Sequence, residues 1–151
     1  MNVGDRAVEI VELTAGATHP LRRSVLRDGT PSDQVVFDGD DAPTTFHLGA
    51  RVDDRLVAIS TWIERPYRAL PALAYQLRGM ATDPAARGGG VASAVLHAGI
   101  ERCRARHVAI VWARARVDAI GFYARLGFAT RGVRYTDEIT GMLHVDIVRH
   151  L

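Results

Sequence analysis

Twenty consecutive residues near the middle of the chain, LRGMATDPAARGGGVASAVL (77–96), constrain the fold more than any other part of the sequence. An apolar run ends at Asp83-Pro84, three glycines follow Arg87, and a helical spacing of apolar residues begins after Gly90. This order predicts a strand, a tight loop and a helix. The first N–H groups of a helix lack intrahelical acceptors, and the helix dipole attracts negative charge to them. The segment therefore predicts a binding site for a diphosphate group.

Three alternative interpretations of the glycine loop differ in what they require. A nucleotide-binding P-loop ends in Gly-Lys-Ser/Thr, whereas Val91 follows Gly90 here, so no lysine is available for a terminal phosphate. A dinucleotide-binding fingerprint lies near the first strand and precedes an acidic residue by about twenty positions. Here Gly88-x-Gly90-x-x-Ser93 follows several expected strands, and no such acid comes after it. A loop that binds nothing is disfavoured because three consecutive glycines cost conformational entropy.

The composition is that of one soluble domain spanning residues 1–151. Hydrophobic residues make up 48% of the chain, which is enough for one core, and the formal net charge is only +2. This small charge, without any basic run interleaved with aromatic residues, argues against a nucleic-acid or membrane partner. The N-terminus lacks a signal-peptide pattern and no apolar run approaches the length of about 18 residues that a membrane span needs. We therefore expect a cytoplasmic location.

Cysteine and histidine usage excludes two further kinds of site. The single cysteine, Cys103, excludes an intrachain disulfide and a cysteine-based zinc site. Its place beside the apolar face of a helix makes it a poor nucleophile. The six histidines are scattered without metal-ligand spacing, so no metal is expected. His97 falls on the polar stripe of the helix after the glycine loop, where we expect it to be solvated.

The remaining sequence alternates strand and helix patterns without an internal repeat or a linker. Strands are expected at residues 7–13, 46–52, 56–63, 74–82, 108–112, 128–133 and 142–148. Helices are expected at residues 19–27, 90–106 and 118–126, with Thr18 capping the first and Asp118 the third, which Gly127 ends. Residues 28–43 indicate a long surface loop. The pattern predicts an α/β fold in which helices pack on a central sheet.

Two blocks, in this order, resemble the GCN5-related N-acetyltransferase (GNAT) superfamily. Residues 87–92 (RGGGVA) match its acetyl-CoA loop, Arg/Gln-x-x-Gly-x-Gly/Ala, and Thr82-Asp83-Pro84 precedes this loop at the expected distance. Residues 119–128 (AIGFYARLGF) look like its A-x-x-F-Y-x-x-x-G-F segment. One helix and one buried strand separate the blocks, which with their flanks cover about residues 74–133. The resemblance implies a GNAT-like α/β (α+β) fold, with a mixed, centrally splayed β-sheet flanked by helices.

The resemblance also implies where acetyl-CoA, the expected co-substrate, would bind. Backbone amides of the glycine loop would hold its pyrophosphate, and Arg87 would close the loop and add charge. Amides near Met80 and Thr82 would pair with the pantetheine arm like an added strand, and Gly79 permits a bulge there. The expected acetyl-CoA-binding residues are Met80, Ala81, Thr82, Arg87, Gly88, Gly89, Gly90, Val91, Ala92 and Ser93.

Two catalytic roles follow from the same resemblance. The Met80 amide would donate to the thioester oxygen while the amine attacks, and a donor fixed there contributes about 3–4 kcal/mol. Tyr123 would protonate the departing CoA thiolate or donate a hydrogen bond to it. The alternative for Tyr123 is a core tyrosine beside Phe122 and Leu126. The general base stays open among a chain of water molecules and the side chains of His47, Glu64 and His144.

Charged residues outside the two blocks each have a functional and a structural interpretation. Three acids of the long loop either draw a cationic amine toward the acceptor site or are simply solvated: Asp38, Asp40 and Asp41. Three arginines of the first helix either bind an acidic acceptor or the adenosine phosphate, or form an exposed helix face: Arg22, Arg23 and Arg27. Arg114 departs from the family pattern, because some relatives carry at this place an Asn that points into the active site.

The sequence thus predicts an N-acetyltransferase that moves an acetyl group from acetyl-CoA to a primary amine by direct attack, without a covalent enzyme intermediate. The acceptor would be a small-molecule or peptide amine, and another short acyl-CoA could replace the donor. The rival prediction is a non-catalytic acyl-CoA-binding or sensing module of the same fold. A homodimer stays open, with the last strands as the candidate contact.

Overall fold

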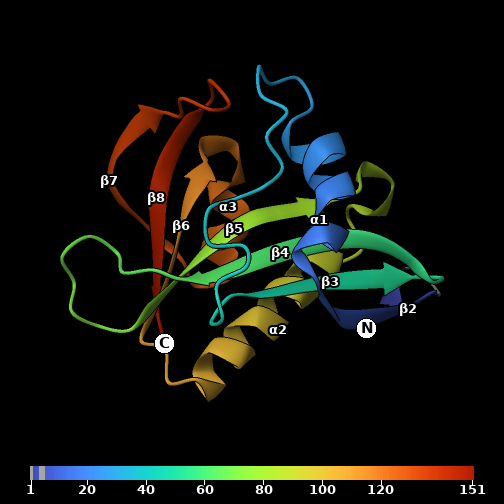
Figure 1. Cartoon of the computed structure of the whole chain (residues 1–151), viewed down its shortest axis with the longest axis horizontal. Helices are drawn as coiled ribbons and strands as arrows, with labels where there is room; N and C mark the ends of the chain where they lie inside the picture. The colour runs from blue at the N-terminus through green and yellow to red at the C-terminus, as the bar shows by residue number, and fades with distance from the viewer. Residues whose placement is uncertain (1, 4–5) are drawn as a thin grey trace.

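The protein is described by a computed structural model covering residues 2–3 and 6–151. Figure 1 shows a twisted sheet with helices packed on both of its faces. The elements in chain order are β1 (Asn2–Val3), β2 (Arg6–Leu13), α1 (Ala15–Leu21), η1 (Arg22–Leu26), β3 (Phe46–Val52), β4 (Arg55–Glu64), β5 (Ala74–Thr82), η2 (Pro84–Ala86), α2 (Val91–Ala105), β6 (Ile110–Arg116), η3 (Val117–Ala119), α3 (Ile120–Arg125), β7 (Ala129–Thr136) and β8 (Leu143–His150).

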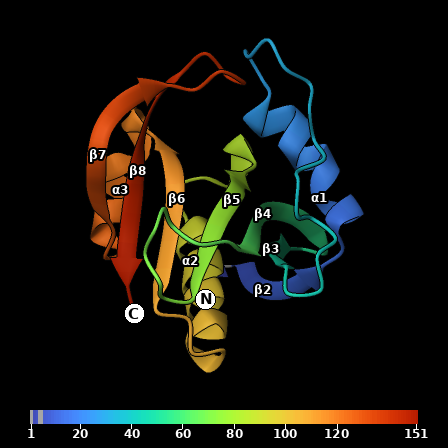
Figure 2. The ribbon, with the colours of Figure 1, turned by 60° about the vertical axis from the view of Figure 1, so that its left-hand side comes forward.

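The sheet has the strand order β1-β2-β3-β4-β5-β6-β8-β7. The pairs are antiparallel except for β5 and β6, which run parallel. Pairing between β5 and β6 extends only from Ala74 opposite Ile110 to Gln76 opposite Trp112. Beyond these residues the two strands diverge, as Figure 2 shows. The predicted mixed, centrally splayed sheet flanked by helices is confirmed.

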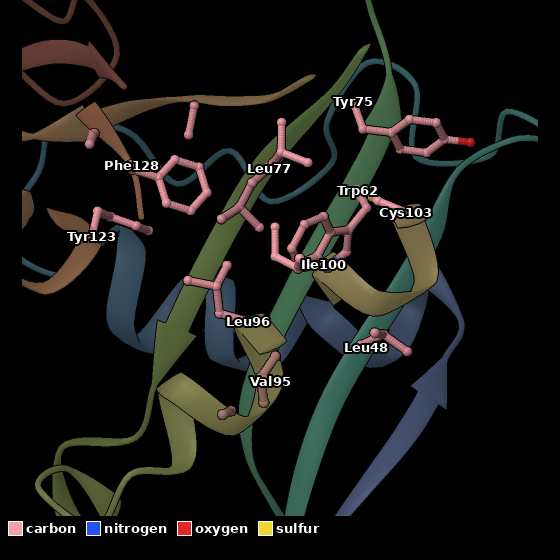
Figure 3. Close-up of a cluster of buried hydrophobic side chains, with 14 of the residues drawn as sticks. Leu48, Trp62, Tyr75, Leu77, Val95, Leu96, Ile100, Cys103, Tyr123 and Phe128 are labelled. Carbon is pink, nitrogen blue, oxygen red and sulfur yellow. The ribbon is translucent and has the colours of Figure 1, made fainter. Parts of the chain in front are cut away.

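The main core lies between α2 and one face of the sheet (Figure 3). Val95, Leu96 and Ile100 project from α2 toward Trp62 of β4 and Leu77 of β5, and all five side chains are buried. The apolar stripe of α2 accounts for this arrangement, because burying one helix face against a sheet removes apolar surface from water. The docked helix holds the glycine loop, which precedes it, beside the diverging end of β5.

The first helix begins earlier than the sequence predicts. Thr14 caps α1, because its hydroxyl accepts a hydrogen bond from the Ala17 N–H at 3.3 Å. Thr18, the expected cap, is buried within the helix and donates its hydroxyl to the Ala15 carbonyl. The prediction failed because two threonines four residues apart can both cap a helix, and β2 ends at Leu13, directly before the first of them.

Two boundaries near the second motif also differ. β6 continues to Arg116 rather than ending at Trp112, because Ala113 and Ala115 face the core while Arg114 and Arg116, which alternate with them, lie on the other face of the strand. Asp118 does not cap α3: a short 3-10 turn, η3, leads into the helix, and its N-cap has no side-chain hydrogen bond. The extension of β6 matters because it places two additional arginines beside the diverging strands. Among the described residues, no helix is long and apolar enough to cross a membrane.

Candidate active site

A cavity of about 620 Å³ opens where β5 and β6 diverge. Its walls come from the end of η1, the long loop that follows, the outer half of β5, the segment from β6 to α3, and the turn between β7 and β8. The diverging edges of β5 and β6 have no strand partner at this point, so backbone N–H and C=O groups are available to a ligand. An extended ligand inserted between the two strands would complete their pairing.

The glycine loop offers a row of unpaired donors beside this cavity. Gly88 and Gly90 have φ angles of +85° and +78°, which glycine adopts without strain. A Cβ at Gly88 would meet nothing within 4 Å, so the loop surface is open. Within the described part of the chain, the N–H groups of residues 88–93 have no protein acceptor. They stand at the N-terminus of the 15-residue α2, a geometry that suits an anion.

The expected acetyl-CoA residues fall into two groups in the structure. Five of them line the cavity: Met80, Ala81, Thr82, Arg87 and Ala92. The others form the loop and first helical turn next to it without lining it: Gly88, Gly89, Gly90, Val91 and Ser93. The Val91 side chain is buried in the core, so only its backbone can face a ligand. Arg87 folds back toward β5, with its Nε donating to the Thr82 carbonyl at 3.3 Å.

A β-bulge interrupts β5 at the cavity wall. Residues 59–61 of β4 face residues 78–81 of β5, so β5 carries one extra residue there. Gly79 has a φ of +60°, and a Cβ at this position would lie 2.8 Å from the Phe37 ring. The predicted bulge at Gly79 is confirmed, and its glycine is needed for both the φ angle and the close approach of Phe37. Because a bulge leaves one residue out of the ladder, the backbone around Met80 is a candidate donor to a ligand.

Tyr123 lies on α3 at the boundary between the main core and the cavity (Figure 3). Its ring meets Phe122 and Phe128 edge-on, with centroid distances of 5.1 and 5.6 Å, and these contacts fix its orientation. The hydroxyl has no hydrogen-bond partner among the described residues. Burial raises the pKa of Tyr123 to about 12, so the phenol keeps its proton throughout the neutral range. Tyr123 is therefore both a core residue and a cavity residue.

Among the three side chains considered as a general base, His144 is the one that lines the cavity. Both ring nitrogens of His47 are engaged, at 2.8 Å from the Thr61 hydroxyl and 3.0 Å from the Asp40 carbonyl. Glu64 is exposed at the end of β4, away from the cavity lining. The Nδ1 of His144 lies 3.0 Å from the Met142 carbonyl, which assigns the proton to Nδ1 and leaves Nε2 as an acceptor.

A buried ion pair stands where the sequence suggested solvated charges. The Arg22 guanidinium is fully buried and donates to both Asp40 carboxylate oxygens, at 2.7 and 2.9 Å. It also donates to the Val35 carbonyl and the Thr61 hydroxyl, at 2.7 Å each. Although burial alone would raise the pKa of Asp40, the bonds from Arg22 and from the Phe37 N–H hold that pKa below its ordinary value. The pair anchors the long loop on the sheet.

This ion pair corrects two sequence interpretations. Arg22 is not on an exposed helix face, and Asp40 neither draws an amine nor stays solvated, because each compensates the charge of the other in the interior. Asp38, Asp41 and Arg23 are exposed, as the simpler interpretation expected. Arg27 lines the cavity. The buried pair was missed because the two residues are eighteen positions apart and meet only when the loop folds over β4.

Sequence reasoning also missed Arg78 and Phe37 as cavity residues. Both line the cavity, and the Arg78 guanidinium carbon lies 4.3 Å from the Phe37 ring centroid. A signal was present, because Arg78 is the charged residue within the otherwise uncharged strand 74–82. Arg114, noted in the sequence as a departure from the family pattern, lines the cavity from β6. Within the described segments, no group of three or more His, Cys, Asp or Glu side chains could hold a metal ion.

Comparison with known proteins agrees with this architecture. The family model of the Acetyltransferase (GNAT) family matches residues 14–128, and the chain belongs to that family. An uncharacterized N-acetyltransferase of Bacillus subtilis strain 168, YitI, is 30% identical over 126 residues, which cover 83% of this chain and 85% of that protein.

Two solved structures show the same fold at low sequence identity. FeeM, an N-acyl amino acid synthase from uncultured soil microbes, has a TM-score of 0.82 and 12% identity, with 96% of this chain and 91% of that chain covered. ElaA of Escherichia coli has a TM-score of 0.78 and 18% identity, with 95% and 99% covered. Both matches extend the structural likeness over nearly the whole chain.

Proposed function

We propose that this member of the GNAT family transfers an acetyl group from acetyl-CoA to a primary amine. The observation that carries the proposal is the cavity at the β5–β6 divergence, where an open row of backbone donors, a β-bulge and Tyr123 come together. Family membership supports an acyltransferase, and FeeM, an N-acyl amino acid synthase with the same fold, also places an acyl group on nitrogen. The cytoplasmic location and the homodimer stay predictions from the sequence.

The donor side of the site fits acetyl-CoA in three respects. The free N–H groups at the start of α2 would hold the pyrophosphate, and the exposed Arg87 next to them adds positive charge. The unpaired edge of β5 would bind the amide groups of the pantetheine arm. The open surface above Gly88 leaves room for the phosphates to approach the backbone.

The bulge would supply electrostatic catalysis. When the amine nitrogen attacks the thioester carbonyl, the carbon–nitrogen bond forms and negative charge builds on the carbonyl oxygen. The Met80 N–H, in a stretch of β5 that the bulge removes from regular pairing, is the donor proposed for that oxygen. A single fixed donor of this kind contributes about 3–4 kcal/mol.

Tyr123 would act on the leaving sulfur as the carbon–sulfur bond breaks. An ordinary thiol has a pKa of about 8.5, whereas burial raises the pKa of Tyr123 to about 12. Full proton transfer from this phenol to a thiolate would therefore be unfavourable by about 5 kcal/mol. Tyr123 is thus better suited to donating a hydrogen bond that stabilises the departing thiolate, which then takes its proton from solvent.

His144 would take the proton that the amine loses. It lines the cavity on the same sheet face as Arg114 and Arg116, opposite the face covered by α2. Its Nε2 is the free acceptor, and the Nδ1–H bond to the Met142 carbonyl orients the ring. A buried, oriented imidazole with a free acceptor nitrogen is a standard arrangement for a general base.

Calorimetric titration with acetyl-CoA, followed by an assay of acetyl-CoA consumption with pooled amines, tests the proposal. We expect saturable binding and amine-dependent release of CoA. The variant Gly88→Ala should bind acetyl-CoA about tenfold more weakly, because the methyl group both strains the positive φ and occupies the open approach. Gly29→Ala is the matched control, since Gly29 also has a positive φ and an open surface but lies outside the cavity lining.

Two outcomes would contradict this assignment. Absence of binding heat would reject the donor site. Binding of acetyl-CoA without consumption in the presence of any amine would instead favour the rival prediction, a non-catalytic acyl-CoA-binding module.

A further inference from the structure

Arginines dominate the side of the cavity that faces away from α2. Arg78 from β5, Arg114 and Arg116 from β6, and Arg27 after η1 line this wall. Of the two cavity acids, Asp137 belongs to the turn between β7 and β8 and Asp118 lies in η3, before α3. The wall therefore presents more positive than negative charge to whatever enters beside the acyl donor.

Arg78 carries a charge that no protein group compensates. It is half-buried, and it has neither a hydrogen bond nor an ion pair with any described residue. Its guanidinium stacks on Phe37 at 4.3 Å, and the same ring has Arg22 at 3.8 Å and Arg27 at 5.6 Å. Burial, followed by the nearby arginines, lowers the pKa of Arg78 to about 10, so the side chain is still cationic at neutral pH.

Arg114 is the second cation with all its donors available. Its guanidinium carbon lies 5.8 Å from the Trp112 ring centroid, and no described residue forms a hydrogen bond or ion pair with it. The other two arginines are already engaged, since Arg116 donates to the Leu26 carbonyl and Arg27 to the Gln34 carbonyl. Arg78 and Arg114 therefore flank the divergence, one on each strand, with open guanidinium groups.

Two of the neighbouring carboxylates are already engaged by other groups, whereas the exposed Asp118 forms no hydrogen bond or ion pair with a described residue. Asp146 sits opposite Arg114 in the strand register, but its oxygens accept bonds from Tyr67, Tyr135 and Arg68. Asp137 accepts the N–H and the hydroxyl of Thr140, at 2.8 and 3.0 Å. The half-buried, unpaired guanidinium of Arg78 gains most from a planar anion that it can bind through two parallel hydrogen bonds, and the exposed Arg114 would offer a second cation to the same anion.

We propose that the acceptor amine carries a carboxylate, which Arg78 and Arg114 hold while the amino group faces the acyl donor. The acceptor class is therefore an amino carboxylic acid, and this inference rests on the function proposed above. Phe37 orients the Arg78 guanidinium by stacking on it. Because the Phe37 ring also packs against Gly79, the carboxylate site lies next to the bulge that carries the proposed oxyanion donor. Anchoring the acid at a fixed distance from the bulge would position its nitrogen for attack.

The test compares each of the common amino acids with its own primary amide in the acetyl-CoA consumption assay. The two compounds share the amine and the side chain, but the amide has no negative charge. We expect kcat/KM to be about 10- to 100-fold higher for the preferred acid than for its amide. At neutral pH, a larger fraction of the amino group is unprotonated in the amide than in the acid, which makes the amide the more reactive nucleophile. Faster turnover of the acid would therefore not be a consequence of amine reactivity. The corresponding aminophosphonic acid should be a poorer acceptor, and equal or faster turnover of it would reject a carboxylate site.

Three variants assign the effect to residues. Arg78→Gln and Arg114→Gln should each remove most of the preference for the acid, mainly through a higher KM, while acetyl-CoA binds as in the parent protein. Arg51→Gln is the matched control, because Arg51 is exposed on β3 outside the cavity lining and should change nothing. Persistence of the full preference in both cavity variants would overturn the proposal.

The remaining outcomes separate this inference from the proposed function. Equal turnover of acids, amides and simple alkylamines would overturn the carboxylate site and leave the acetyltransferase intact. If acetyl-CoA binds but no amine is acetylated, the CoA complex is titrated with N-acetyl amino acids and with their amides. If the acids bind more tightly than their amides, and Arg78→Gln abolishes this difference, the carboxylate site is supported independently of any acetyltransferase activity. Equal binding, or none, would overturn it.

Discussion

At the scale of single residues, Tyr123 shows how one side chain can pack in the core and also line the cavity. Two aromatic rings hold it by their edges, and the burial that fixes the ring also raises the pKa of its hydroxyl to about 12. The hydroxyl has no hydrogen-bond partner among the described residues, and its oxygen, unlike the Nε of Arg22, is not fully buried, which is consistent with its place at the cavity. A ligand that reaches the cavity would supply the missing partner.

Replacing Tyr123 by Phe tests the chemical role without disturbing the packing. We expect kcat to fall about 10²- to 10⁴-fold, because the leaving thiolate loses its donor. The dissociation constant for acetyl-CoA should stay within about twofold, since the ring contacts persist. Steady-state kinetics and calorimetry on the same preparation measure both quantities. Unchanged kcat would reduce Tyr123 to a core residue.

Replacing His144 by Gln tests the general base. We expect kcat/KM to fall about 10²- to 10⁴-fold, with acetyl-CoA binding retained, because the amine then has no positioned acceptor for its proton. His97→Gln is the matched control, since His97 is exposed on α2 and should tolerate the change. If both variants turn over at the parent rate, water rather than His144 takes the proton.

At the scale of elements, one glycine decides how closely α2 approaches the sheet. A Cβ at Gly99 would overlap the Trp62 indole, and Trp62 is fully buried beneath the helix. Glycine lowers helix propensity by about 1 kcal/mol relative to alanine, so its presence inside α2 is a cost that close packing offsets. The position of the glycine loop depends on this contact because the loop leads directly into α2.

Comparing Gly99→Ala with Gly121→Ala separates the effect of core packing on stability from the effect of helix propensity. Gly99→Ala should destabilise the fold by about 1–3 kcal/mol, because overpacking outweighs the gain in helix propensity. Gly121→Ala on α3 should be neutral or stabilising by up to about 1 kcal/mol, since the nearest atom to its Cβ is 3.9 Å away. Urea unfolding measures both changes. Equal effects would mean that the Trp62 contact does not limit the approach of α2.

The buried pair of Arg22 and Asp40 secures the loop that carries Phe37 and the cavity wall. Asp40→Ala should lower the free energy of unfolding by about 3–5 kcal/mol, because it leaves the Arg22 charge buried and unpaired. Asp38→Ala is the matched control, because the Asp38 side chain is fully exposed and its ion pair with Arg65 is a surface one. This variant should leave the urea midpoint unchanged. The double variant Arg22→Met, Asp40→Leu should be less destabilised than Asp40→Ala; a larger loss would contradict the charge argument.

At the scale of the whole molecule, several buried acids have raised pKa values, and this sets the response to alkali. Burial raises the pKa of the Cys103 thiol to about 12. A group with a raised folded pKa gives its full stabilisation below the unfolded pKa and loses it as the pH rises toward the folded pKa. All 19 Lys and Arg residues are in fact arginine, so no lysine titrates in the same range. Stability should therefore decline above about pH 9.

Chemical unfolding at pH 8 and pH 10 checks this expectation. The parent protein should lose about 3 kcal/mol between these values, and Cys103→Ala should lose about 2 kcal/mol less, because the thiol no longer titrates in the unfolded chain. The comparison ends at pH 10 because the pKa of Arg78 in the folded protein is lowered to about 10. Above that pH, the loss of its proton in the folded state increases the free energy of unfolding and would mask the effect of Cys103. An identical loss in both proteins would rule out Cys103 as the source.

The sequence by itself determined the local elements around which the proposed donor site is built. The glycine loop, the following amphipathic helix and the segment around Tyr123 are local patterns, since each is read from residues that are close together in the sequence. The predicted boundaries of strands and helices were wrong in two kinds of place. Two residues could cap the same helix, as with Thr14 and Thr18, or the hydrophobic pattern was weak, as at the alanines of β6.

The tertiary structure alone decided which side chains line the cavity wall of the proposed acceptor site. Arg22 pairs with Asp40, and Phe37 packs against both Gly79 and Arg78, although the partners are far apart in the sequence. Arg114 lines the same cavity as Arg78 but comes from a different strand. Whether an arginine is solvated, paired or left open to a ligand depends on which segments the fold places around it. Periodicity reports the face on which a residue lies but not its neighbours there, so the positive charge of this cavity wall emerges only when the chain is folded.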